Sequence, residues 1–93
     1  MSYEINETLR NECQQTLKTF EKLNKPETAE LQSKLAWCLG SYDFDKNPSG
    51  LYEYGVVALE TMKDIKKANP RKINKKVIDG LEVGLRNYNN SSN

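Results

Sequence analysis

Apolar residues recur every three or four positions along most of the chain, the spacing that places them on one face of an α-helix. No segment alternates apolar and polar residues in the manner of a half-buried β-strand. The pattern is interrupted near Pro26, Pro48 and Pro70. Because proline is tolerated in the first turn of a helix but not in its interior, these positions mark corners between helices. The sequence therefore predicts an all-α fold of four helices.

The predicted helices cover residues 3–23, 27–43 and 48–68, and a fourth begins at 71–75. Short connections favour antiparallel neighbours, so a four-helix bundle and two stacked helical hairpins both fit the pattern. The residues predicted to face the core are Ile5, Leu9, Cys13, Leu17, Phe20, Leu23, Leu31, Leu35, Cys38, Leu39, Tyr42, Leu51, Tyr54, Gly55, Ala58, Leu59, Met62, Ile65, Ile73, Val77, Ile78, Leu81 and Leu85.

The chain length of 93 residues suits one small domain with a modest core. We expect a single helical domain over residues 1–88. Residues 89–93 offer no core-forming side chain and are expected to form a disordered tail.

Small residues inside the third and fourth predicted helices indicate where helices approach closely. Gly55 lies near Ala58, and Gly80 lies one turn before Gly84. A glycine inside a helix costs roughly 1 kcal/mol relative to alanine, a cost that close packing against a neighbour can offset. We therefore expect the third and fourth helices to cross tightly at these residues.

The composition argues against several classes of function. The chain has no histidine, which removes the commonest general base and the usual zinc ligand. Cys13 and Cys38 fall on the apolar faces and are expected to be reduced core residues. We predict that the protein is not an enzyme and uses no cofactor or metal. The chain has no apolar run of membrane-spanning length and no signal peptide, so no membrane partner and a cytoplasmic location are expected.

Five of the eight aromatic residues lie within residues 36–55. At 100° per residue, Trp37 and Phe44 share a side of the second helix that differs from its main apolar face. Burial of Trp37 against the first or third helix is the favoured interpretation, since tryptophan is highly buried on average. The alternative is an aromatic surface for a partner, with Trp37 and Phe44 as candidate protein-binding residues.

Asp43, Asp45 and Asn47 have the spacing of the first ligands of an EF-hand calcium loop. The loop also needs glycine at its sixth position and glutamate at its twelfth, where this chain has Pro48 and Tyr54. Aspartate and asparagine side chains that cap local N–H groups of a turn explain the same residues. We expect a turn rather than a metal site here, and no catalytic pair of carboxylates.

Trp37, Ser41 and Phe44, followed by Ala58 and Pro70, resemble the helical hairpin of tetratricopeptide repeats over about residues 31–70. The stretches "AWCL" and "GVVALE" also have a slight similarity to the leading hairpin of mitochondrial fission adaptors. The resemblance implies a helical-hairpin interaction module without a specific partner. The positions that depart from the repeat pattern are Gly40, Met62 and Ile65.

Half of the basic residues lie between residues 63 and 76, where Asp64 is the one acid. Lysines near the start of the fourth helix are unfavourable there, because the helix dipole disfavours cations at that end. The region therefore predicts either a solvated surface or an anion site. The candidate anion-binding residues are Lys67, Arg71, Lys72, Lys75 and Lys76.

The favoured function is a small, non-catalytic, helical protein-interaction module. The alternative is anion or nucleic-acid binding through the basic region, 63–76. Another protein is the expected partner. A homodimer is left open, and nucleic acid is the less favoured partner because no aromatic residue is interleaved with the lysines.

Overall fold

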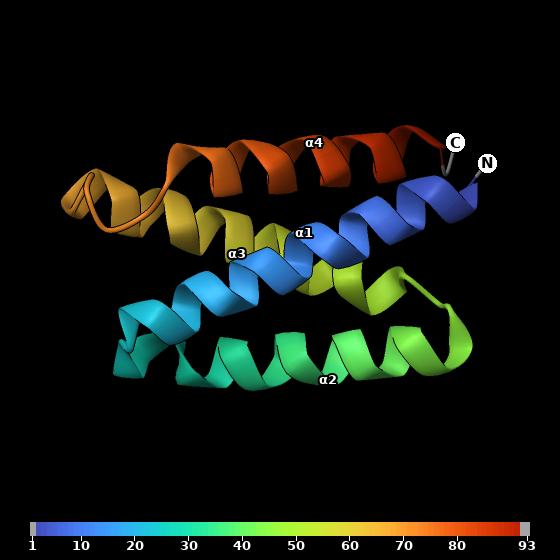
Figure 1. Cartoon of the computed structure of the whole chain (residues 1–93), viewed down its shortest axis with the longest axis horizontal. Helices are drawn as coiled ribbons and strands as arrows, with labels where there is room; N and C mark the ends of the chain where they lie inside the picture. Colours follow the sequence, from blue (N-terminus) through green and yellow to red (C-terminus); the bar gives the residue numbers. More distant parts are fainter. Residues whose placement is uncertain (1, 92–93) are drawn as a thin grey trace.

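The computed structural model describes residues 2–91, which form four α-helices (Figure 1). The all-α prediction is confirmed, and helices that follow one another in the chain run antiparallel. A short 3₁₀ turn, η1, precedes the second helix. The elements are α1 (Ser2–Leu23), η1 (Pro26–Thr28), α2 (Ala29–Asp45), α3 (Ser49–Ala68) and α4 (Lys75–Ser91).

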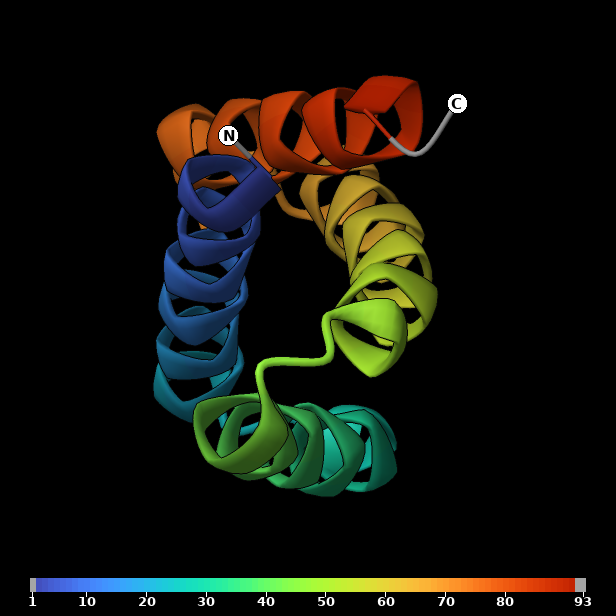
Figure 2. The same cartoon turned by 90° about the vertical axis from the view of Figure 1, so that its right-hand side faces the viewer.

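The helices form a bundle in which α1 packs against both α2 and α4, and α3 packs against the same two helices. The end-on view in Figure 2 shows α2 and α4 at opposite positions of this arrangement. Because α1 and α4 are antiparallel neighbours, the start of α1 lies beside the end of α4, whereas the end of α1 diverges from the start of α4 (Figure 1). Within residues 2–91, no helix combines the length and apolarity that a bilayer crossing requires.

The first two corners follow from residues in left-handed backbone conformations. Asn24 has a φ of 51° and its N–H donates to the carbonyl of Phe20, which ends α1. Lys46 has a φ of 60° and donates in the same way to Tyr42, which ends α2. The second helix begins at Ala29 rather than at residue 27, because Pro26–Thr28 first form the 3₁₀ turn.

Asparagine side chains organise the starts of the last two helices. Asn47 Oδ1 accepts hydrogen bonds from the N–H and hydroxyl of Ser49, where α3 begins, one residue after the predicted Pro48. Asn74 Oδ1 accepts one from the N–H of Lys76 in the first turn of α4. Both are capping interactions that satisfy backbone donors left free at a helix start.

The last helix is longer than the sequence predicted. It continues to Ser91, three residues past the predicted domain boundary at residue 88, and residues 92–93 of the predicted tail lie outside the described part of the chain. Tyr88, in the last turns of α4, packs against Tyr52 of α3 with ring centroids 5.1 Å apart. This aromatic contact fixes the last turns of α4 against α3. The polar residues that follow Tyr88 can therefore extend the helix without packing against the core.

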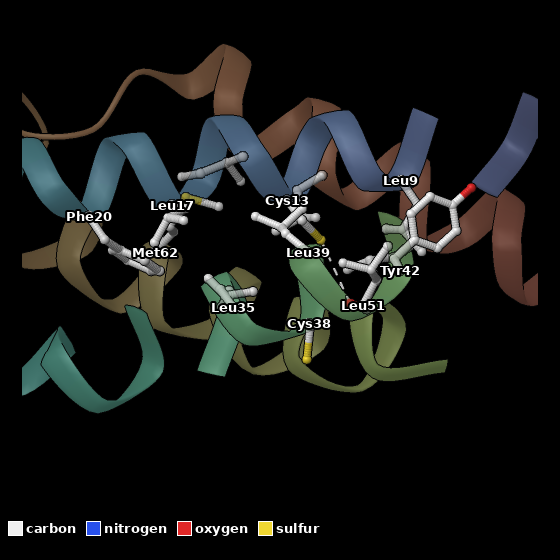
Figure 3. Packing of buried hydrophobic residues seen from close by; sticks show 14 of the residues in the cluster. Leu9, Cys13, Leu17, Phe20, Leu35, Cys38, Leu39, Tyr42, Leu51 and Met62 are labelled. Atoms are coloured by element: carbon white, nitrogen blue, oxygen red, sulfur yellow. Dashed lines mark hydrogen bonds between the residues drawn. The ribbon is translucent and has the colours of Figure 1, made fainter. Parts of the chain in front are cut away.

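The buried hydrophobic residues all come from the predicted apolar faces (Figure 3). Thr16 and Thr28, which were not predicted, are buried as well, and the unpredicted Tyr52 and Tyr88 pack against the core. Residues such as Leu31 and Leu59 lie half-buried at its edge and pack against it. The buried core residues are Leu9, Cys13, Leu17, Phe20, Leu35, Cys38, Leu39, Tyr42, Leu51, Ala58, Met62, Ile73, Ile78, Leu81 and Leu85.

The glycines place the closest helix approach between α1 and α4. A Cβ atom at Gly84 would lie 3.6 Å from the Cα of Leu9, and one at Gly80 would collide with the carboxylate of Glu12. The expected tight crossing with α3 is therefore wrong for Gly80 and Gly84. It is correct for Gly55, where a Cβ would lie 2.9 Å from Leu85 of α4.

Candidate functional site

The outer side of α2 carries the two most exposed large apolar residues that the structure describes. Trp37 is 71% exposed and Phe44 is 92% exposed. They are seven residues apart, so they lie on one side of the helix about 10 Å apart along its axis. Gly40 and Ser41 lie between them on the same side. We call these four residues the aromatic face.

Burial of Trp37 was the favoured expectation and is wrong. The inner side of α2 already contacts α1 and α3 through Leu35, Cys38, Leu39 and Tyr42. The remaining helix, α4, lies across the bundle from α2 (Figure 2). Among residues 2–91 there is consequently no helix left to cover the side on which Trp37 lies.

A small hollow of about 150 Å³ adjoins the aromatic face. It lies where the end of α2 meets the start of α3, so it combines the indole of Trp37 with polar groups. Its lining residues are Trp37, Cys38, Ser41, Asp45, Asn47, Ser49 and Gly50. The hollow is large enough for one side chain of a partner, and not for a cofactor, for which pockets of about 300 Å³ or more are usual.

The turn interpretation is confirmed for Asp45 and Asn47, whereas Asp43 has a long-range partner instead of a local one. Asp45 Oδ1 accepts a hydrogen bond from the N–H of Asn47, and Asn47 in turn caps α3. Asp43 points to α1, where Arg10 Nε and Nη2 donate to its two oxygens at 3.2 and 3.1 Å. Within the described part of the chain, no group of three or more His, Cys, Asp or Glu side chains could hold a metal ion.

Asp43 belongs to a polar cluster that ties α2 to α1. The hydrogen bond from Arg10 holds the pKa of Asp43 below its ordinary value. Tyr42 donates its hydroxyl to Glu7 at 2.6 Å, and the ammonium of Lys46 lies 3.7 Å from the same carboxylate. A lowered pKa favours the ionised form of Asp43, which suits an ion pair and not the proton-donating role of a general acid.

Both cysteines are free and buried, as expected. Burial raises the pKa of Cys13 to about 12, and it also raises the pKa of Cys38. The thiolate is the reactive form of cysteine, so these shifts favour the unreactive thiol at neutral pH.

The candidate basic residues divide into two groups. Arg71 and Lys72 lie in the link between α3 and α4 and line an open groove of about 900 Å³ against the end of α1. The structure does not place Lys67, Lys75 and Lys76 in the lining of this groove. The lining residues, which define the basic groove, are Gln15, Lys18, Thr19, Glu21, Lys22, Arg71, Lys72, Ile73, Asn74 and Val77.

Lys18 and Lys22 also line the groove, although the sequence pattern did not predict them as binding residues. They are one turn apart on α1, so they share a side of the helix. The signal that could have found them is topological. In an antiparallel bundle that brings the fourth helix beside the first, the end of the first helix faces the link before the fourth.

Lys66 has an internal role instead. Its ammonium donates to the carbonyls of Pro70 and Ile73, at 3.0 Å each. These two bonds connect the last turn of α3 to the link that carries Arg71 and Lys72. One lysine of the basic region therefore shapes the link.

Comparison of the chain with models of known protein families, with curated proteins and with solved structures found no match. The tetratricopeptide resemblance is thus supported only at the level of an all-helical fold whose neighbouring helices pack together. The aromatic residues that carry it, Trp37 and Phe44, lie on the outer side of α2 and take no part in helix packing.

Proposed function

We propose that this protein is a non-catalytic, helical protein-binding module whose contact surface is the aromatic face of α2. The observation that carries the proposal is the exposure of Trp37 and Phe44 on one side of one helix. Tryptophan is enriched among the residues that dominate binding energy at interfaces. An exposed tryptophan and phenylalanine on the same face leave apolar area in water, and a partner would remove that area from water.

The geometry of the aromatic face favours a helical partner. Two aromatic anchors about 10 Å apart match apolar side chains two turns apart on a second helix. Gly40 lies between the two aromatic residues and has no side chain. A Cβ atom added at Gly40 would have no atom of the described residues within 4 Å. A partner backbone could therefore approach α2 closely at this point. This arrangement supports a helical interaction module without assigning the partner.

Site-specific photo-crosslinking in cells tests the proposal. A photoreactive phenylalanine analogue is placed at position 37 or 44, and as a control at Val83 on α4, which is 46% exposed. We expect one discrete adduct from positions 37 and 44 and none from position 83. An adduct of two copies of this chain would identify a homodimer as the use of the face. Equal adducts at all three positions, or none at 37 and 44, would refute the proposal.

Tryptophan fluorescence gives a second readout, because Trp37 is the one tryptophan of the chain. In the dilute protein its emission should resemble that of a solvated indole. It should shift to shorter wavelength when the purified partner, or a second copy at high concentration, covers the face. Emission typical of a buried indole in the dilute monomer would show that Trp37 is not exposed and would contradict the proposal.

A further inference from the structure

The basic groove lies apart from the aromatic face and has a different chemistry. Its walls come from α1 and from the α3–α4 link with the start of α4, and α2 contributes no lining residue. Four cations, Lys18, Lys22, Arg71 and Lys72, line it together with one acid, Glu21. Cations therefore face the groove from both walls.

These four cations line one groove, and none of them has a carboxylate within ion-pair distance among residues 2–91. Lys66, Lys67, Lys75, Lys76 and Arg86 also lack such a partner, but they lie outside the lining. Five basic side chains outside the groove pair with acids of the same protein. Those paired basic residues are Arg10, Lys25, Lys34, Lys46 and Lys63. The positive charge of the groove is consequently available to a ligand.

We infer that the basic groove binds an acidic segment of a partner protein in an extended conformation. A volume of about 900 Å³ far exceeds one phosphate or carboxylate group, so a chain carrying several anionic groups fits it better than a single ion. Cations on two walls can pair with carboxylates on alternate sides of an extended peptide.

Uncharged groups of the lining also suit a peptide. The Thr19 hydroxyl donates to the carbonyl of Gln15, and its oxygen can still accept a peptide N–H. The Gln15 side chain offers both a donor and an acceptor, and half-buried Val77 gives the groove an apolar part. Such a mixture of amide, hydroxyl and aliphatic groups matches a peptide backbone and its side chains.

Nucleic acid is the less suitable occupant. Proteins that bind single strands stack the bases on aromatic side chains, and the groove lining contains no aromatic residue. The acidic peptide is therefore the ligand that the lining favours.

Fluorescence anisotropy with the purified protein tests the inference. The probe is a fluorescein-labelled, eight-residue peptide of alternating glutamate and serine, and the reference peptide has glutamine in place of glutamate. We expect the glutamate peptide to bind, to bind more weakly as salt is added, and to exceed the reference peptide in affinity by about tenfold or more. The absence of binding at low salt would overturn the inference.

A matched pair of double variants localises the binding. Lys18→Gln with Arg71→Gln removes two groove cations, whereas Lys34→Gln with Arg86→Gln removes the same charge from elsewhere. We expect the first pair to weaken binding about tenfold and the second to change it by less than about twofold. Equal losses would show a general charge effect and overturn the groove assignment. Because all four side chains are on the surface, circular dichroism is expected to show folded variants.

Two further arms separate the alternatives. A single-stranded thymidine octanucleotide that binds more tightly than the glutamate peptide, and depends on Lys18 and Arg71, would replace the peptide with nucleic acid. Substituting Trp37→Ser with Phe44→Ser should leave peptide affinity unchanged. That result would keep the inference independent of the proposed function of α2.

Discussion

α2 and α4 occupy opposite positions in the bundle, and α1 holds them in different ways. α4 approaches α1 through Gly80 and Gly84, with the Leu9 backbone close to Gly84. α2 is held by long apolar side chains and, at one end, by the polar cluster that includes Arg10 and Asp43. Two helices whose backbones approach closely need small residues such as glycine at the contact. Helices that pack through long side chains do not have this requirement.

The outer sides of the two helices differ as well. The outer side of α4 exposes charged and amide side chains with one half-exposed valine, Val83, whereas the outer side of α2 exposes Trp37 and Phe44. The aromatic residues are therefore a local property of α2. The difference shows that helices with similar positions in the bundle can have outer sides of very different polarity.

The most demanding test of this comparison concerns the two sides of α2. Leu35 is fully buried, so Leu35→Ala should lower the free energy of unfolding by about 2–5 kcal/mol. Trp37→Ala removes a larger side chain but should change stability by less than about 0.5 kcal/mol, since the indole is on the surface. Urea unfolding followed by circular dichroism measures both. Comparable losses in the two variants would mean that Trp37 is part of the core.

A second test concerns the close approach of α4 to α1. Gly84→Val should destabilise the protein by about 1–3 kcal/mol, because the added methyl groups meet the backbone of α1. The matched substitution Gly40→Val on the outer side of α2 should be close to neutral, as a Cβ there enters open space. The same urea titrations compare them. If both valines are tolerated, the helices α1 and α4 are not in close contact.

A smaller effect is expected from alanine on α2. Gly40→Ala should raise the free energy of unfolding by about 0.5–1 kcal/mol, because alanine has the higher helix propensity and its methyl group meets no described atom. Gly55→Ala is the control, since its Cβ would lie 2.9 Å from Leu85 and strain should cancel the gain. Thermal unfolding detects the difference. A loss of stability in Gly40→Ala would reveal a contact on the outer side of α2.

The smallest effect concerns the polar attachment of α2. Arg10→Gln should raise the pKa of Asp43 toward its ordinary value of 3.8. Because the folded pKa lies below that value, the ion pair stabilises the protein above it, and this contribution is lost as the pH falls through the folded pKa. A carbon-detected NMR titration of the Asp43 carboxyl group in both proteins measures the shift. An unchanged pKa in Arg10→Gln would show that the pair does not hold α2.

The helices and the core could be predicted because they depend on local spacing. The apolar positions of α1, such as Leu9, Cys13 and Phe20, are sufficient to define its buried side. Asn47 likewise accepts a hydrogen bond from the N–H of Ser49, two residues along the chain. Structural features that depend only on residues close together in the chain can therefore be predicted from the local sequence.

The parts that could not be predicted depend on which helices are neighbours. Periodicity shows that α2 has a second aromatic side, but only the arrangement of the bundle shows that no described helix covers Trp37. The same holds for Gly80, whose partner is α1 and not α3. Lys18 and Lys22 acquire a role only because an element far along the chain faces them across the groove.

The two hydrogen bonds of Lys66 to the link carbonyls have a consequence for how the α3–α4 connection could be altered. Acylation of this one amine, or its replacement by glutamine, would release the carbonyls of Pro70 and Ile73 from their donor. The guanidinium of Arg71, which follows Pro70 in the link, would keep its charge. Chemical modification at a residue outside the lining would thus remove these two contacts between α3 and the link while leaving the charges of the lining intact.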